Sequence, residues 1–220
     1  MTTDTQRAYD NKYTVHNYFR YYEWLYRPYI SSLISYCEMP RGASVLDVGC
    51  GQGFFSYLLN QLGMRVQGID ISESGVRAAR QAYGKCGIVF EVADIETAQL
   101  QKQFDCVFVR SCSLYNTATF PMSEAVTDKL LSHVKSNGTF IFLYNTNFSR
   151  QKSVSWRYHS LADLRNHFDK YTDPRLFFSS RIDARILGKR AFSPFFTRAN
   201  MLASRTCGTG GDLICVLKKP

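Results

Sequence analysis

The segment Val45–Gly53, Val-Leu-Asp-Val-Gly-Cys-Gly-Gln-Gly, constrains the fold of this chain more than any other. Three strand-forming apolar residues surround one acid and lead into a glycine at every second position. Residues 54–59 then have the pattern of a buried helix. Because glycine adopts dihedrals that other residues avoid and carries no Cβ, such a turn lets a ligand approach bare backbone. The segment therefore predicts a strand, a tight ligand-binding turn and a helix.

Two common phosphate-binding glycine loops do not fit this turn. A nucleoside triphosphate loop ends in Gly-Lys-Ser or Gly-Lys-Thr, whereas Gly53 is followed by two phenylalanines. The dinucleotide fingerprint has its third glycine three residues after Gly51, where this chain has Phe54. The turn therefore disfavours a nucleoside triphosphate and also a nicotinamide or flavin dinucleotide.

Two further acids end predicted strands at a spacing that suits a nucleoside. The strand over 65–70 ends in Asp70, 21 residues after Gly49, and the strand over 88–92 leads to Asp94. A carboxylate about 20 residues past the loop lies where a ribose binds, because the second parallel strand ends beside the first. A single acid at a strand end is usually a helix cap. Two of them in register with an acid ahead of the loop indicate a ligand site instead.

The loop resembles the first motif of the class I S-adenosylmethionine-dependent methyltransferases, and the two later acids extend that resemblance over somewhat under half of the chain. It implies S-adenosylmethionine as cofactor and S-adenosylhomocysteine as product. In the family, the acid that matches Asp94 binds the adenine amino group, and the backbone of its neighbour contacts the ring. The residues that the resemblance assigns to the cofactor are Asp47, Gly49, Cys50, Gly51, Gly53, Asp70, Ile71, Asp94, Ile95 and Arg110.

The rest of the pattern predicts an α/β fold. Strands at 104–109 and 139–144 flank a predicted helix over 129–138 that ends at an Asn-Gly pair, and a last strand covers 213–217. Strands that alternate with helices predict a doubly wound, mostly parallel sheet with helices on both faces. The family resemblance adds an antiparallel final hairpin and seven strands in all.

We expect a single domain with three parts: an N-terminal helical lid (1–40), a cofactor-binding core (41–146), and an acceptor-side basic segment with the final strands (147–220). Seven of the 14 tyrosines lie between Tyr9 and Tyr29, and a helix so aromatic must pack against something. One interpretation is a helix that covers the sheet edge. The other is a lid, as in many methyltransferases resembling this one, with Tyr13 and Arg20 at the cofactor.

Composition is that of an ordinary globular protein, with 45% hydrophobic and 20% charged residues. The sequence has no apolar run of the ~18 residues that a membrane span needs, and its first six residues lack the apolar core of a secretory signal. We therefore expect a cytoplasmic protein. Seven cysteines without a Cys-x-x-Cys pair and four scattered histidines predict no metal site. Nothing in the sequence indicates an oligomeric state.

Charge is concentrated in the last third of the chain. Residues 1–149 carry 13 Lys plus Arg and 13 Asp plus Glu, whereas residues 150–220 carry 14 and 5, which gives the whole net charge of +9. A basic segment interleaved with phenylalanines suits an anionic small molecule, a nucleic-acid backbone or an acidic membrane surface. An ordinary solvated face around core aromatics explains it equally well.

The only sequence feature that restricts the class of methyl acceptor is the absence of a known signature. After Val109 the chain lacks the Asn/Asp-Pro-Pro-Tyr/Phe signature of methylation on exocyclic base amines. This favours an oxygen or nitrogen of a small-molecule acceptor, an anionic one among the options. The alternatives are an RNA or protein methyltransferase that docks through the basic third, and a non-catalytic cofactor-binding module.

Methyl transfer mainly requires orientation, which lowers a barrier by about 7–11 kcal/mol. A hydroxyl or ammonium acceptor must also lose a proton, and histidine is the usual base. His159 precedes a predicted helix where family members place acceptor contacts, so we predict it as the base; an exposed residue beside a helix cap is the alternative. Tyr115 and Tyr144 are expected to border the same space. His133 and His167 lie within helical patterns and are expected at the surface.

Overall fold

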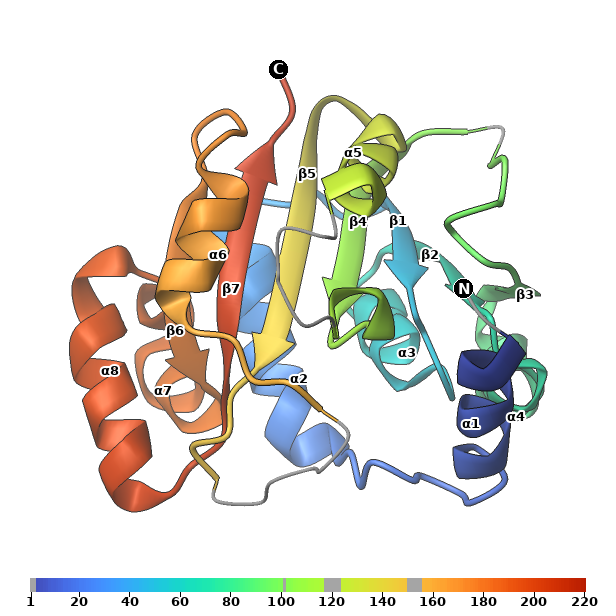
Figure 1. Ribbon diagram of the computed structural model, residues 1–220, viewed down its shortest axis with the longest axis horizontal. Coiled ribbons are helices and arrows are strands. Elements are labelled where there is room, and N and C mark those ends of the chain that lie inside the picture. Colours follow the sequence, from blue (N-terminus) through green and yellow to red (C-terminus); the bar gives the residue numbers. More distant parts are fainter. Residues whose placement is uncertain (1–2, 101, 117–123, 150–155) are drawn as a thin grey trace.

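The computed structural model of the chain describes residues 3–100, 102–116, 124–149 and 156–220. At its centre is a seven-stranded sheet in the order β3-β2-β1-β4-β5-β7-β6 (Figure 1). The strands are β1 (Ser44–Val48), β2 (Arg65–Asp70), β3 (Val89–Val92), β4 (Phe104–Arg110), β5 (Val134–Asn145), β6 (Arg175–Ser180) and β7 (Gly211–Lys218). Strands β1 to β5 are parallel, and β7 runs antiparallel between β5 and β6. The predicted mostly parallel sheet with antiparallel final strands is confirmed, although residues 181–210 separate β6 from β7, so that the two strands are not joined as a hairpin.

Helices cover both faces of this sheet, with α2 behind it and α6 in front of it in Figure 1. The α-helices are α1 (Thr3–Lys12), α2 (Glu23–Tyr36), α3 (Phe54–Gln61), α4 (Glu73–Tyr83), α5 (Glu124–Ser132), α6 (Leu161–Phe168), α7 (Arg181–Leu187) and α8 (Pro194–Cys207). Short 3-10 turns are η1 (Gly84–Cys86), η2 (Ser113–Tyr115) and η4 (Gly188–Ala191). Among the described residues, no helix is both long enough and apolar enough to cross a bilayer.

Side-chain alternation along the central strands builds one core on each face. In β5, Ile141 and Leu143 belong to the core that contains α2 and α3, whereas Phe140 and Phe142 belong to the core that contains α5 and α6. All four side chains are completely buried. Burial on both faces explains why these strands are nearly continuous apolar runs in the sequence.

The helix predicted over 129–138 is wrong at its end, because α5 stops at Ser132 and β5 begins at Val134. Asn137 does adopt the left-handed conformation, with φ of 61°. Its backbone nitrogen donates to the carbonyl of Lys219 at 2.9 Å, and the nitrogen of Lys219 donates to the carbonyl of Gly138 at 3.0 Å. The Asn-Gly pair therefore turns the chain within β5, held by the end of β7, and does not cap a helix.

Two histidines expected at the surface are buried. His133 is 8% exposed and His167 only 1% exposed. The Nε2 atom of His167 lies 3.0 Å from the Thr127 hydroxyl, which lies 2.8 Å from the Tyr115 hydroxyl. The surface expectation was wrong because α6 turns the His167 side of the helix toward the sheet.

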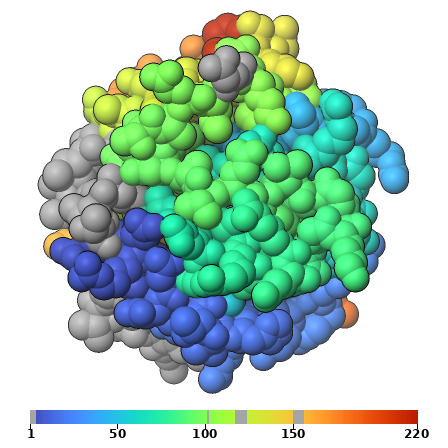
Figure 2. All heavy atoms as spheres, turned by 90° about the vertical axis from the view of Figure 1, so that its right-hand side faces the viewer, coloured from blue at the N-terminus to red at the C-terminus, as the bar shows by residue number. Residues whose placement is uncertain are grey.

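The N-terminal part divides into two elements with different positions. Helix α2 packs on the sheet, with Tyr29, Ile30 and Leu33 completely buried. Helix α1 instead lies against α4, beyond the carboxyl ends of the first strands (Figure 1). Figure 2 shows the N-terminal segment in blue directly against the green segments of the core. The sheet-covering interpretation therefore fits α2, whereas the role of α1 as a lid stays a prediction.

Candidate functional site

The glycine turn between β1 and α3 is held in shape by the neighbouring strand. Gly49, Gly51 and Gly53 have φ values of 75°, 52° and 81°, which favour glycine. The Gly49 nitrogen donates to the carbonyl of Ile69 at 2.9 Å. The Gly51 nitrogen donates to the Asp70 carboxylate at 2.8 Å. The end of β2 therefore sets both the loop conformation and the position of the acid.

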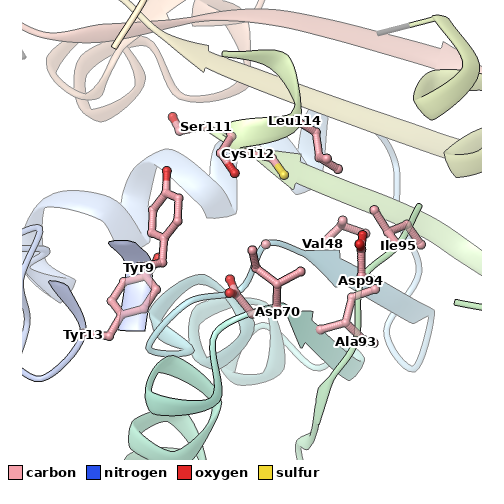
Figure 3. A pocket seen from close by; sticks show the side chains of 14 residues that line it. Tyr9, Tyr13, Val48, Asp70, Ala93, Asp94, Ile95, Ser111, Cys112 and Leu114 are labelled. Atoms are coloured by element: carbon pink, nitrogen blue, oxygen red, sulfur yellow. The ribbon is translucent and has the colours of Figure 1, made fainter. Parts of the chain in front are cut away.

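A cavity with an empty volume of about 460 Å³, including the solvent at its mouth, lies at the carboxyl ends of the first strands (Figure 3). Parallel α/β sheets bind their ligands at this edge. Its lining residues are Tyr9, Tyr13, Val48, Gly49, Ile69, Asp70, Ile71, Ala93, Asp94, Ile95, Ser111, Cys112, Ser113 and Leu114. In Figure 3, Tyr9 from α1 and Tyr13 from the turn directly after it face this space, opposite Asp94 and Ile95.

Six of the residues assigned to the cofactor from the sequence line this cavity together: Tyr13, Gly49, Asp70, Ile71, Asp94 and Ile95. Asp70 is 7% exposed, and burial raises its pKa to about 6. Its second oxygen accepts a hydrogen bond from the Ser72 nitrogen at 2.9 Å. Asp94 accepts from the Glu96 nitrogen at 2.9 Å and so also caps the following turn. The two acids are thus anchored at separate parts of one cavity.

Other residues assigned to the cofactor support the loop from beneath or beside it. Asp47 is 2% exposed and accepts a hydrogen bond from the Ser56 hydroxyl at 2.5 Å. Cys50 is buried, and burial raises the pKa of its thiol. An added Cβ on Gly51 would lie 2.7 Å from the Tyr13 hydroxyl oxygen. At Gly53 an added Cβ would meet side chains of the core instead.

Arg110 points away from the cavity into an aromatic box on the α2 face of the sheet. Its side chain is 6% exposed and pairs with the fully buried Asp212 at 3.2 Å. It also donates to the Tyr21 hydroxyl at 3.1 Å and lies 4.6 Å from the centre of the Phe55 ring. A buried carboxylate needs such a partner. The side chain of Arg110 therefore joins β4 to β7 and does not line the cavity.

Of the two residues expected in the lid, one lies at the cavity and one does not. Tyr13 is 8% exposed, and its ring also packs on Gly75, where an added Cβ would lie 2.8 Å away. Arg20 is exposed, with φ of 53°, and does not line the cavity. Tyr9 was missed from the sequence. It lies four residues before Tyr13, whose nitrogen donates to the Tyr9 carbonyl at 2.9 Å, so the i, i+4 spacing of the two tyrosines was the available signal.

One glutamine of the glycine turn latches the N-terminal segment. The Gln52 amide nitrogen donates to the carbonyls of Val15 at 2.8 Å and Tyr13 at 3.2 Å. Its oxygen accepts from the Tyr18 nitrogen at 3.1 Å. At the other end of the segment, the Asp10 carboxylate accepts from the Ser72 hydroxyl at 2.6 Å. The segment that carries Tyr9 and Tyr13 is therefore tied to both edges of the cavity.

We expect Gln52→Glu to loosen this latch, because a carboxylate keeps the size of the amide but cannot donate to two carbonyls. Net hydrogen bonds of about 1 kcal/mol each imply at least tenfold faster amide exchange over residues 13–18. Hydrogen–deuterium exchange measures this change, with Gln81→Glu, at an exposed position of α4, as the matched control. Equal exchange in both variants would contradict the latch.

His159, Tyr115 and Tyr144 do come together, but as a packed cluster beside the cavity. The His159 Nε2 atom lies 3.2 Å from the Tyr115 carbonyl oxygen. The fully buried Tyr144 donates its hydroxyl to the carbonyl of Arg157 at 2.7 Å. Burial lowers the pKa of His159. None of the three lines the cavity, but Tyr115 directly follows Leu114, which does line it.

The buried Asp47 gives the fold a pH dependence of definite sign. Burial raises its pKa from 3.8 to about 7, so the folded state holds the proton more tightly than the unfolded chain does. Ionisation therefore destabilises the fold as the pH rises from about 4 to about 7. The difference in free energy of unfolding between Asp47→Asn and wild type is expected to be about 2 kcal/mol more in favour of the variant at about pH 8 than at about pH 5. Urea denaturation at both pH values tests this; a pH-independent difference would contradict it.

Comparison with known proteins identifies the family. A family model described as a methyltransferase domain matches residues 40–189, which is more than half of the chain. The chain belongs to this methyltransferase domain family. Family and fold together put it among the class I S-adenosylmethionine-dependent methyltransferases, as the glycine loop and the two acids indicated.

One curated relative is the malonyl-(acyl-carrier protein) O-methyltransferase of Acetivibrio thermocellus, 31% identical over 103 residues, or 44% of this chain and 34% of that protein. The match spans about a third or less of the length of the first curated relatives. These relatives therefore do not fix the acceptor of this methyltransferase.

Two solved structures show the same fold along nearly the whole chain. The N-methyltransferase NodS of Bradyrhizobium japonicum, in complex with S-adenosylhomocysteine, has a TM-score of 0.67 at 14% identity and covers 98% of each chain. The phosphoethanolamine N-methyltransferase 2 of Haemonchus contortus has a TM-score of 0.66 at 16% identity, covering 99% of this chain and 59% of that one. Such low identity relates the architectures and not the acceptors.

Proposed function

We propose that this protein binds S-adenosylmethionine in the cavity that α1 borders and transfers its methyl group to an oxygen or nitrogen of a small molecule. The observation that carries the proposal is the position of Asp70. Its carboxylate lines the cavity at the end of β2 and accepts a hydrogen bond from the glycine loop. A ribose between this acid and the loop is the arrangement that nucleoside-binding α/β folds use.

The lining residues suit each part of the cofactor. Asp70 is assigned to the two ribose hydroxyls, because a carboxylate accepts two hydrogen bonds at once. The adenine is assigned to the opposite wall, where Asp94 can accept from its amino group and the buried Ile95 supplies an apolar contact. When bound, the cofactor supplies a methyl group that its sulfonium has already activated.

Tyr9 and Tyr13 are assigned the exclusion of water. Burial raises the pKa of Tyr9 to about 12 and that of Tyr13 well above its ordinary value. Both phenols therefore remain neutral at physiological pH, so that they form an apolar wall with a polar tip. Closing such a wall over reactants strengthens the polar interactions inside and holds the acceptor in line.

His159 is assigned as the base for an acceptor that must lose a proton. Its pKa is lowered by burial, so the imidazole is neutral near pH 7 and able to accept. A hydrogen bond from Nε2 to the Tyr115 carbonyl requires the tautomer with the proton on Nε2, which makes Nδ1 the accepting nitrogen. Tyr115 and Tyr144 act in this assignment as positioning residues.

The test is transfer of radiolabelled methyl groups from S-adenosylmethionine to a panel of small hydroxyl, amine and carboxyl acceptors. Phosphoethanolamine belongs in this panel because a protein of the same fold carries its name, and a malonyl thioester because a relative does. For the acceptor that reacts, His159→Ala is expected to lower turnover by about a hundredfold or more while cofactor affinity is unchanged. Unchanged turnover at every pH would remove the base assignment. Cofactor binding without transfer to any acceptor would favour a non-catalytic module.

We further propose that the acceptor is anionic, which the salt dependence of its binding can test. The basic last third would attract an acceptor that carries phosphate or carboxylate. We expect the Michaelis constant for phosphoethanolamine, if it reacts, to rise with salt more steeply than that for an uncharged amine. Equal salt dependence would leave a neutral acceptor as the better assignment.

A further inference from the structure

Helix α8 buries polar side chains and leaves two large apolar side chains exposed. Its buried positions are Thr197, Asn200 and Ser204. On the opposite side, Phe195 is 84% exposed and Leu202 is 66% exposed. Helices on a core normally bury their apolar stripe and leave polar residues in water. The reversal indicates that the outer face of α8 is itself a contact surface.

The polar inner face has a clear role at the edge of the sheet. The Thr197 hydroxyl accepts a hydrogen bond from the backbone nitrogen of Phe178 in β6 at 3.2 Å. Exposed edge strands need such partners for their unpaired backbone groups. In Figure 1, α8 lies outside β6 at the extreme edge of the molecule. The edge strand thus accounts for the buried side of α8 but not for Phe195 and Leu202.

The outer face of α8 is also basic. Arg198 and Arg205 are exposed and lie on the same side of the helix as Phe195 and Leu202. The preceding helix α7 adds an exposed pair of the same kind, Arg185 and Ile186, the latter 75% exposed. Residues 181–207 contain six Lys plus Arg and one acid. That acid, Asp183, accepts from the Ser180 nitrogen in the cap of α7.

The combination of apolar and basic side chains selects among partners. A second copy of this chain would bring two strongly positive faces together, which repel. A nucleic acid would use the arginines and could stack on Phe195, but it gains little from Ile186 or Leu202. An anionic lipid surface uses both kinds of residue, because apolar side chains enter the headgroup region while basic ones attract the lipid charge.

We propose that the outer face of α8 docks this protein on an anionic membrane surface. Phe195 and Leu202 enter the headgroup region, and Arg198 lies at the level of the lipid phosphates. This surface lies at the β6 edge of the sheet, whereas the cavity lies near β1 and β2. The surface therefore shares no residue with the lining of the cavity.

The experiment is sedimentation of the full chain with vesicles of phosphatidylcholine alone or with one quarter phosphatidylglycerol. We expect binding only to the anionic vesicles. The double variant Phe195→Ser with Leu202→Ser is expected to lower the partition coefficient about tenfold, and Arg198→Glu at least about fivefold. Cofactor binding and the urea midpoint should stay unchanged, since these side chains are exposed.

Matched controls lie at the opposite edge of the sheet. Val89→Ser removes a side chain that is 52% exposed on β3, and Lys85→Glu reverses an exposed charge in η1. Both should bind within about twofold of wild type. Absence of vesicle binding, or equal binding to neutral vesicles, overturns the proposal. So does normal binding by the Phe195 and Leu202 double variant, because attraction by charge alone would point to an acidic protein or a nucleic acid.

Discussion

An Asp70→Ala variant is expected to bind S-adenosylmethionine and S-adenosylhomocysteine about a hundredfold more weakly than the wild type. Charge-assisted hydrogen bonds to two ribose hydroxyls contribute about 1.5 kcal/mol or more each, and about 2.7 kcal/mol corresponds to a hundredfold change in affinity. Calorimetric titration measures both affinities. Asp105→Ala is the matched control, because that carboxylate pairs with Lys135 near the amino end of β4, away from the cavity.

The same acid makes cofactor affinity depend on pH. Because burial raises the pKa of Asp70 to about 6, the wild type loses the accepting charge as the pH falls through that value. Affinity should therefore decline below about pH 6 in the wild type and stay flat in Asp70→Asn. Wild-type affinity for either ligand in Asp70→Ala, at neutral pH and with a normal melting curve, would contradict the ribose assignment.

A Gly53→Ala variant is expected to lose about 3 kcal/mol of unfolding free energy. With φ of 81°, any Cβ at this position is strained by about 1–2 kcal/mol. The added Cβ would also lie 2.8 Å from the Ala79 Cβ and 2.9 Å from the Phe90 ring. Overpacking of this kind costs typically 1–3 kcal/mol. Urea denaturation of the variant and the wild type measures the summed loss of unfolding free energy.

Two other glycines separate the parts of this effect. Gly87 has φ of 77° with nothing within 4 Å of an added Cβ, so Gly87→Ala should show the backbone cost alone. Gly84 has φ of −60° and equally open surroundings, so Gly84→Ala should be neutral or slightly stabilising. If Gly53→Ala lowered the free energy of unfolding no more than Gly87→Ala, the close packing of Gly53 against Ala79 and Phe90 would not explain why glycine is needed at position 53.

The strand-turn-helix segment could be predicted because its signals are local. Glycine spacing fixes the turn, and the lengths of the next two units fix where Asp70 and Asp94 end their strands. Parallel strands then bring those ends to one edge, so the sequence predicted that the two acids share a site. The expectation for Tyr13 came from the family resemblance, because the aromatic pattern of the N-terminal segment alone left a helix on the sheet edge equally open.

Arg110 could not be placed in the same way. It ends a buried strand at the correct edge, but the side on which its side chain leaves the sheet depends on Asp212, about a hundred residues later in the chain. The end of α5 and the burial of His167 could not be predicted for a related reason. The Asn-Gly pair signals a left-handed turn without specifying its element, and the burial of His167 depends on contacts with Thr127 that no local pattern contains.

The most direct test of the cavity assignment is a crystal structure of the protein with S-adenosylhomocysteine. We expect the ribose hydroxyls within hydrogen-bonding distance of Asp70, the adenine beside Asp94 and Ile95, and Tyr9 and Tyr13 over the ligand. A well-ordered ligand bound elsewhere, or one whose ribose does not contact Asp70, would contradict the proposal that this cavity is the cofactor site.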